Sequence, residues 1–205
     1  MINYNITAAV LLSSILAGAS IGIGGWVYLS VGGIVGAMLF SIGLMTITIR
    51  NYSLYTGRIG LFSDIKELSY FLIVFVGNLI GVLIVGLMFR ASTTIDTTYI
   101  IEAKLTLNYK QIFYRSMLCG ILMYLATACC GARQSPIYAV PFVTVFILCG
   151  AEHCIANTFY IITSQSYNIE TAKFLGMNIL GNTLGSISWR YIESLITNLQ
   201  KGEQT

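Results

Sequence analysis

The sequence predicts an all-α membrane protein of six helices, in which two halves of three helices form an inverted repeat and the second and fifth helices are broken. Three observations support this prediction. Hydrophobic residues make up 56% of the chain and charged residues 9%, whereas roughly 25% of the residues in a soluble domain are charged. Six apolar windows follow one another along the chain. Two of them contain polar residues that a lipid-facing helix could not carry.

Each apolar window approaches the roughly 20 residues that cross a hydrocarbon core. The windows are 7–29, 31–49 followed by a broken segment at 50–66, 68–89, 113–130, 137–162 with a break near 150–157, and 174–196. The connections are too short to hold a separate soluble domain, so residues 1–205 are expected to form a single transmembrane domain. The longest connection, 90–111, is predicted to be a partly structured loop outside the hydrocarbon.

The break in the second window runs from Arg50 to Gly60 and reads RNYSLYTGRIG. Its glycines can adopt positive φ, and its polar side chains can bond backbone groups that a helix would otherwise pair. We therefore expect a loop at membrane depth. Arg50 could contact an anion, pair with Glu152 or reach the interface along its long stem, and pairing or interface packing is favoured.

The break in the fifth window reads GAEHCIAN at 150–157. It places a carboxylate (Glu152), the only histidine (His153) and an amide (Asn157) among apolar residues. Ionisable groups in a membrane segment are costly and usually functional. Because the two breaks occupy corresponding windows, they are typical of an inverted repeat whose broken helices meet at the bilayer midplane.

Small residues at helical spacing predict close contact between helices. They are Gly18, Gly22 and Gly25, the pair Gly32 and Gly36, the pair Gly77 and Gly81, and Gly181 with Gly185. Packing, rather than contact with a substrate, is the expected role of each glycine.

The net charge and the cysteine content indicate which partners and cofactors the chain is not expected to bind. The net charge of +3 is spread along the loops, so no nucleic acid partner is expected, and the balance of Lys and Arg between loops does not orient the chain. The five cysteines lie in or beside apolar windows, which favours reduced, packed thiols. A metal needs three or four converging ligands, and no second histidine exists, so neither a metal nor another cofactor is predicted.

The breaks offer groups that suit an anion. An anion in a membrane must replace its lost hydration with hydrogen-bond donors and at most a few charges. His153 is the strongest candidate, because an imidazole exposed to a pore could donate a hydrogen bond to the anion or give it a proton. The alternative is a buried neutral histidine that bridges two helices.

Two segments resemble the signature of the formate/nitrite transporter family. GAEHCIAN at 150–157 is similar to the family's G-x-E-H-S-x-A-N sequence, and Leu54-Tyr55-Thr56-Gly57 is similar to its L-F-T loop. Shorter matches at 16–19, 40–44, 77–78, 103–104 and 181–182 extend the resemblance over nearly the whole chain.

This resemblance implies an aquaporin-like bundle that assembles as a homopentamer in the cell (inner or plasma) membrane, with one pore per subunit. It implies a channel or transporter, not an enzyme, for small monovalent weak-acid anions such as formate, nitrite or hydrosulfide. Coupling to protons through a central histidine is one option that it leaves open. Both termini would lie in the cytoplasm and the long connection outside.

The resemblance also assigns roles to individual residues. His153 would be the central histidine and Thr56 the loop threonine that can hydrogen-bond it. Asn157 would line the pore, and Lys104 would lie near the outer vestibule and concentrate anions, although a solvated loop lysine is an equal alternative.

Narrow rings of apolar side chains (collars) are expected on both sides of the histidine, where they would remove water from the passing anion and prevent the leak of hydrated ions. Their residues would be Leu44, Leu54 and Tyr55 on one side and Phe40 with Phe146 on the other. Glu152, Arg50 and Asn182 are candidates for a supporting role.

Departures from the family pattern indicate a divergent, short member. Ser53 stands where the family usually has an acidic residue, and Tyr55 replaces a phenylalanine. Tyr124 occupies what resembles a family asparagine position, and Arg50 lies where the family normally has no charge. These differences leave the choice of anion open.

Other classes of function compete with anion passage. A non-conducting scaffold or sensor on the same fold is the main alternative, because Arg50 and Tyr55 could close the pore. A membrane enzyme that uses Glu152, His153 or Cys154 is less favoured, because adjacent residues point to different faces of a helix. A channel for neutral solutes is weakly supported, because paired asparagine-proline-alanine motifs are missing.

Overall fold

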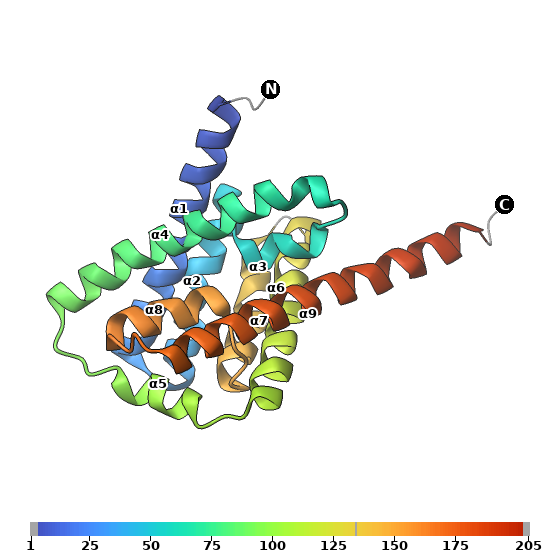
Figure 1. Ribbon diagram of the computed structural model, residues 1–205. Helices are drawn as coiled ribbons and strands as arrows, with labels where there is room; N and C mark the ends of the chain where they lie inside the picture. The colour runs from blue at the N-terminus through green and yellow to red at the C-terminus, as the bar shows by residue number, and fades with distance from the viewer. Residues whose placement is uncertain (1–3, 134, 203–205) are drawn as a thin grey trace.

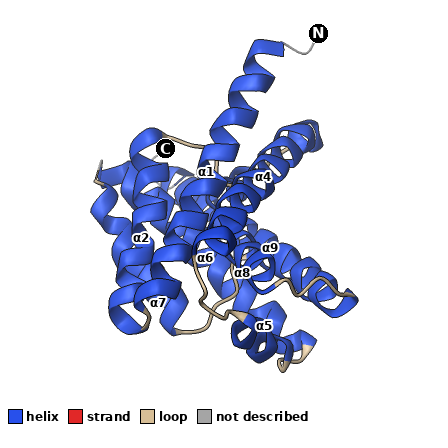
Figure 2. Ribbon diagram, turned by 90° about the vertical axis from the view of Figure 1, so that its left-hand side faces the viewer, coloured by secondary structure: helices blue, strands red, loops and turns tan. Residues whose placement is uncertain are grey.

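Helices account for nearly all of the chain. The computed structural model describes residues 4–133 and 135–202, in which helices are joined by loops and short 3-10 turns (Figures 1 and 2). The helices are α1 Tyr4–Val31, α2 Gly33–Arg50, α3 Tyr55–Arg58, α4 Leu68–Ser92, α5 Thr98–Leu105, α6 Tyr109–Arg133, α7 Ala139–Leu148, α8 Cys154–Ser164 and α9 Ile169–Gly202. When α2 with α3 and α7 with α8 are each counted as one broken helix, and α5 as part of the long connection, the predicted all-α bundle of six is confirmed.

Four helices among the described residues are long and apolar enough to cross a membrane by length and composition. They are Thr7–Val31, Gly33–Arg50, Ile65–Ser92 and Tyr109–Ala132, and two shorter apolar helices span Pro136–Leu148 and Cys154–Ser164. The predicted window 174–196 lies inside α9, which is not among the four. This helix carries the buried polar residues Asn178, Asn182 and Ser186, which pack against other helices instead of facing lipid.

The second broken helix resumes earlier than the sequence indicated. α7 ends at Leu148 and α8 begins at Cys154, so Asn157, which was expected inside the break, lies in the first turn of α8. The side chain of His153 explains the early start, because its Nδ1 accepts the backbone N–H of Ala156 at 3.1 Å and caps the helix. A helix whose first N–H groups are satisfied in this way can begin at that residue. The turn before it uses Gly150 at a positive φ of 64°.

The two halves repeat the same packing between their outer helices. In the first half, a Cβ added to Gly81 of α4 would lie 2.0 Å from the carbonyl oxygen of Ile15 in α1. In the second half, a Cβ on Gly185 of α9 would lie 2.2 Å from the carbonyl oxygen of Met117 in α6. Glycine therefore brings the backbones of α1 and α4, and of α6 and α9, into direct contact, as expected for small residues between membrane helices.

We expect Gly81→Ala to lower the thermal unfolding midpoint of the detergent-solubilised protein. The added methyl group would meet the backbone at Ile15 and Ala19, 2.0 and 2.5 Å away, and overpacking of this kind typically costs about 1–3 kcal/mol. Gly176→Ala in α9 is the matched control, since a Cβ there meets nothing within 4 Å. Equal midpoints for the two variants would show that the helices do not rely on this contact.

Candidate functional site

Two buried asparagines hold the broken helices in the same way in each half. Asn78 of α4 accepts the N–H of Tyr55 at 2.8 Å and donates to the carbonyl oxygens of Ser14 and Ser53 at 2.8 and 2.9 Å. Each of these backbone groups belongs to a break or to the helix beside it. An amide can donate twice and accept as well, so one side chain satisfies two backbone groups of the break, at Ser53 and Tyr55, and ties them to the carbonyl oxygen of Ser14 in α1.

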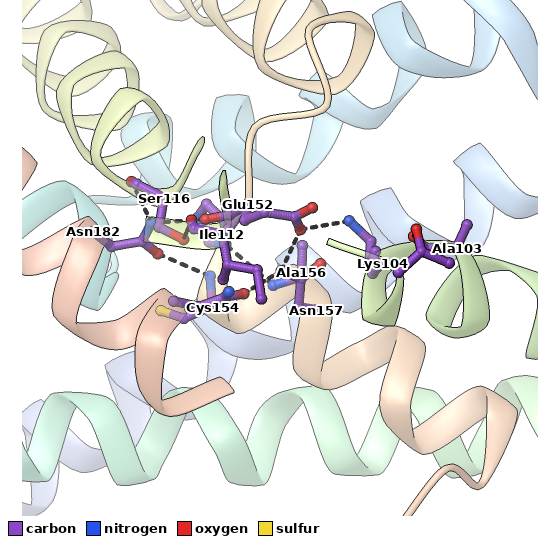
Figure 3. Close-up of polar contacts among 12 residues, drawn as sticks. Ala103, Lys104, Ile112, Ser116, Glu152, Cys154, Ala156, Asn157 and Asn182 are labelled. Atoms are coloured by element: carbon purple, nitrogen blue, oxygen red, sulfur yellow. Dashed lines mark hydrogen bonds and ion pairs between the residues drawn. The ribbon is translucent and has the colours of Figure 1, made fainter. Parts of the chain in front are cut away.

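Asn182 of α9 repeats this arrangement in the second half. It accepts the N–H of Cys154 at 2.9 Å and donates to the carbonyl oxygens of Ser116 and Glu152, each at 2.8 Å. Figure 3 shows the Asn182 amide between Ser116 and Cys154. The two sets of bonds make Leu54 and His153, the residues immediately before α3 and α8, equivalent positions in the two halves. The inverted repeat that the sequence predicted is thus visible in its hydrogen bonds.

His153 and Thr56 meet between the two half-helices. Thr56 Oγ1 lies 2.9 Å from His153 Nε2, and the two residues are 0% and 2% exposed. Because Nδ1 of the ring accepts the Ala156 N–H, it carries no proton, and a neutral imidazole then has its proton on Nε2. The ring therefore donates to Thr56, whose own hydroxyl hydrogen stays free to point elsewhere.

A cavity lies on each side of this contact. One of about 240 Å³ is lined by His153, Asn157, Phe146 and Lys104, among others. The other, of about 730 Å³, is lined by residues that include Leu54 and Gly57, two residues before and one residue after Thr56. The smaller cavity reaches Gly33 at the start of α2 and the larger reaches Asn51 just past its end, so the two hollows lie toward opposite ends of the bundle.

Of the two predicted collars, the structure brings Phe40 and Phe146 together, whereas in the other collar Leu44 and Leu54 are buried and Tyr55 bonds elsewhere. Phe40 and Phe146 pack edge to face with ring centroids 5.6 Å apart, and the Phe146 ring lies 5.8 Å from the imidazole of His153. Leu44 and Leu54 are both 1% exposed. Tyr55 points away from them, because its hydroxyl bonds Thr183 of α9 at 2.8 Å and its ring packs on Phe75 of α4.

Figure 3 shows a polar network, and two of its residues, Lys104 and Asn157, line the smaller cavity. The Nζ of Lys104, which lies in α5, is 2.6 Å from Glu152 Oε2, and the same oxygen accepts Asn157 Nδ2 at 2.8 Å. Asn157 Nδ2 also donates to Asn178 Oδ1 in α9. The side chain of Glu152 is 1% exposed and that of Lys104 18%. A carboxylate this deeply buried needs such partners, because an unpaired buried charge is strongly destabilising.

This network excludes two of the alternatives that the sequence left open. The partner of Glu152 is Lys104 and not Arg50, which is exposed at the end of α2. Lys104 is also not a freely solvated loop lysine, since α5 places it against the start of α8. The physical reason is that α5 folds back over the break, which brings the ammonium group of Lys104 to Glu152.

Asn178 is a site residue that the sequence analysis missed. It is fully buried, and its Nδ2 has no hydrogen-bond partner in the described part of the chain. A signal was present, since Asn178 precedes Asn182 by four residues in an apolar helix and therefore shares its face. Asparagine on the inward face of a membrane helix is expected to bond across the bundle.

Residues 4–133 and 135–202 do not bring together three His, Cys, Asp or Glu side chains that could hold a metal ion. The fold and the site define a multi-pass membrane protein. Its two broken helices meet at a buried histidine and a buried threonine. This architecture belongs to the pore-forming transport proteins.

Comparisons with known proteins agree with that class. The family model described as formate/nitrite transporter matches residues 3–189, and the chain therefore belongs to the formate/nitrite transporter family. This is a family of channels and transporters, so the expectation that the chain is not an enzyme is confirmed. No curated protein matches the sequence.

Solved structures share the fold at low sequence identity. A protein described as an FNT family ion channel superposes with a TM-score of 0.85 at 21% identity, covering 95% of this chain and 92% of that one. A pentameric formate channel with formate bound has a TM-score of 0.74, also at 21% identity, with 97% of each chain covered.

Proposed function

We propose that the chain is a channel for a small monovalent weak-acid anion such as formate, nitrite or hydrosulfide, with His153 and Thr56 at its centre. The observation that carries this proposal is their 2.9 Å contact between two cavities. Membership of a formate/nitrite transporter family and the likeness to a channel with formate bound support the choice of ligand.

The hydrogen bonds suggest how the pair would act on an anion. His153 donates through Nε2 to Thr56 Oγ1, which leaves the threonine O–H as the donor that a passing anion would meet. A hydrogen bond from a polarised hydroxyl is stronger than one from an isolated hydroxyl. In this proposal the imidazole acts through Thr56. A direct contact between anion and ring would require Thr56 to move aside.

The two cavities would receive the anion before and after this contact. On the smaller side, the Lys104 ammonium keeps two N–H donors beyond its bond to Glu152, while Glu152 offsets its charge. Phe40 with Phe146, and Leu44 with Leu54, would exclude water next to the histidine. Apolar constrictions of this kind prevent the leak of hydrated ions.

Assembly and placement are part of the proposal. The similar formate channel is described as pentameric, and we propose a homopentamer with one pathway in each subunit, which the whole chain forms as a single domain. We place it in the inner or plasma membrane with both termini in the cytoplasm and α5 outside. The bilayer is then its surrounding medium and the anion its small-molecule partner.

The alternative is a non-conducting scaffold or sensor on the same fold. Its support is the burial of Thr56 and His153, which are 0% and 2% exposed, so the pathway is closed at its centre in this structure. A channel must open there, and a scaffold need not.

We expect the purified protein in liposomes to raise the uptake rate of at least one of formate, nitrite, hydrosulfide and acetate above that of protein-free vesicles. Stopped-flow measurements at two pH values, with increasing anion concentration, would identify the substrate and its saturation. If a folded, assembled protein passes none of the four anions, the scaffold alternative replaces the channel.

A further inference from the structure

Arg58 stands at the wall of the larger cavity. It ends α3, two residues after Thr56, and is partly buried. The cavity of about 730 Å³ is otherwise lined by neutral groups, so Arg58 is the one charged side chain among its described lining residues. The backbone beside it is fixed, because Thr127 Oγ1 of α6 donates to the carbonyl oxygen of Gly57 at 3.1 Å.

Neutral oxygen atoms hold the Arg58 guanidinium. Its Nη2 donates to Asn51 Oδ1 at 2.9 Å and to the Asn51 carbonyl oxygen at 3.4 Å, and its Nη1 donates to the Tyr70 hydroxyl at 3.3 Å. Two of these bonds are near the upper limit of hydrogen-bond length. A guanidinium has five N–H donors, so these bonds leave at least two without a partner among the described residues.

No carboxylate among the described residues forms an ion pair with this guanidinium. Glu67 lines a smaller hollow with Arg58, and its two oxygen atoms accept the N–H and hydroxyl of Ser63 at 3.0 and 3.3 Å. The ion pairs in the described chain are Lys104 with Glu152 and Lys173 with Glu170. Arg58 therefore differs from Lys104, whose charge Glu152 offsets.

We propose that Arg58 is an anion-binding residue of the larger cavity, specific for small anions that present two oxygen atoms, as carboxylates and nitrite do. The inference rests on the proposed function and deepens it by naming the side chain that captures the anion on the face opposite to Lys104. A guanidinium is a planar fork that matches two oxygen atoms, whereas an ammonium is a point charge. The long bonds to Tyr70 and the Asn51 carbonyl are those that the ligand displaces.

The cavity walls strengthen the attraction between Arg58 and an anion. Low-dielectric walls around a positive charge focus its field and raise the local concentration of small anions. The position of Arg58 beside Gly57 then delivers the anion close to Thr56. Arg58 binds the anion before the central contact and has no role in closing it.

The test compares uptake into liposomes by the wild-type protein, Arg58→Gln, Arg58→Lys and Lys66→Gln. Lys66 is the matched control, because it is an exposed cation in the same connection that does not line the cavity. We expect Arg58→Gln to raise the half-saturating formate concentration by about tenfold and to weaken its dependence on ionic strength. Lys66→Gln should match the wild type. Arg58→Lys should lose affinity for formate but not for hydrosulfide, because hydrosulfide has no pair of oxygen atoms to accept two parallel hydrogen bonds from a guanidinium.

A binding measurement separates this inference from the proposed function. Saturation-transfer NMR of formate with the detergent-solubilised protein should show a signal that Arg58→Gln reduces and Lys66→Gln leaves intact, whether or not the protein conducts. If this holds but no anion is transported, the site stands and the channel proposal falls. Equal half-saturation and equal NMR signals for Arg58→Gln and wild type would overturn the inference, as would an equal effect of Lys66→Gln. Unchanged formate affinity in Arg58→Lys would overturn the assignment to anions with two oxygen atoms.

Discussion

His153→Ala is expected to reduce anion uptake into liposomes by about twofold to tenfold. The substitution deletes the Nε2 donor that lies 2.9 Å from Thr56 Oγ1, so the threonine hydroxyl is no longer polarised. A hydrogen bond between neutral groups is worth roughly 0.5–1.5 kcal/mol, which corresponds to that range of rates. Stopped-flow uptake at one pH and one anion concentration measures the effect.

A second variant separates transport from helix capping. His153 also accepts the Ala156 N–H, and loss of an N-cap costs about 1 kcal/mol by itself. In His153→Asn the side-chain oxygen can cap α8 while the imidazole is absent. We expect this variant to keep the thermal stability of the wild type and still lose transport. A flux equal to that of the wild type in both variants would exclude His153 from the mechanism.

Asn182→Ala is expected to destabilise the protein strongly, and by more than Gly81→Ala does. Two backbone groups of the break would lose their partner, namely the N–H of Cys154 and the carbonyl oxygen of Glu152, and the bond to Ser116 in α6 would also be lost. Each unsatisfied buried group costs roughly 1–3 kcal/mol. Asn78→Ala should have a similar effect, because it would release the equivalent groups in the first half.

Asn198→Ala is the control for these substitutions, since Asn198 is an exposed asparagine in the same helix as Asn182. Thermal unfolding of the detergent-solubilised proteins, followed by intrinsic fluorescence, gives the comparison. If Asn182→Ala unfolds at the same temperature as Asn198→Ala, the amide does not hold the break. A large loss for Asn182→Ala alone would show that the two halves do not contribute equally.

The breaks themselves could be predicted because polar residues in an apolar window have few structural explanations. Glu152, His153 and Asn157 could not face lipid, so they had to lie on the inside of the bundle. The pairing of His153 with Thr56 came from the family resemblance, because the two residues are 97 positions apart and no local pattern links them.

Other contacts depended on how distant segments fold together. The pairing of Lys104 with Glu152 spans 48 residues and requires α5 to fold back over the break, which composition does not indicate. The direction of the Tyr55 side chain likewise depends on the position of Thr183 in α9. Helix ends differed by a few residues because caps such as the one at His153 are made by side chains whose orientation the sequence does not show.

The equivalence of Leu54 and His153 shows where the two halves differ. The two breaks share one backbone arrangement, each fastened by an asparagine, yet one bears an aliphatic side chain where the other bears an imidazole. A chain with two identical halves would carry two imidazoles or none at these positions. The pairing of a single histidine with a single threonine therefore depends on asymmetry between halves that otherwise share one backbone plan.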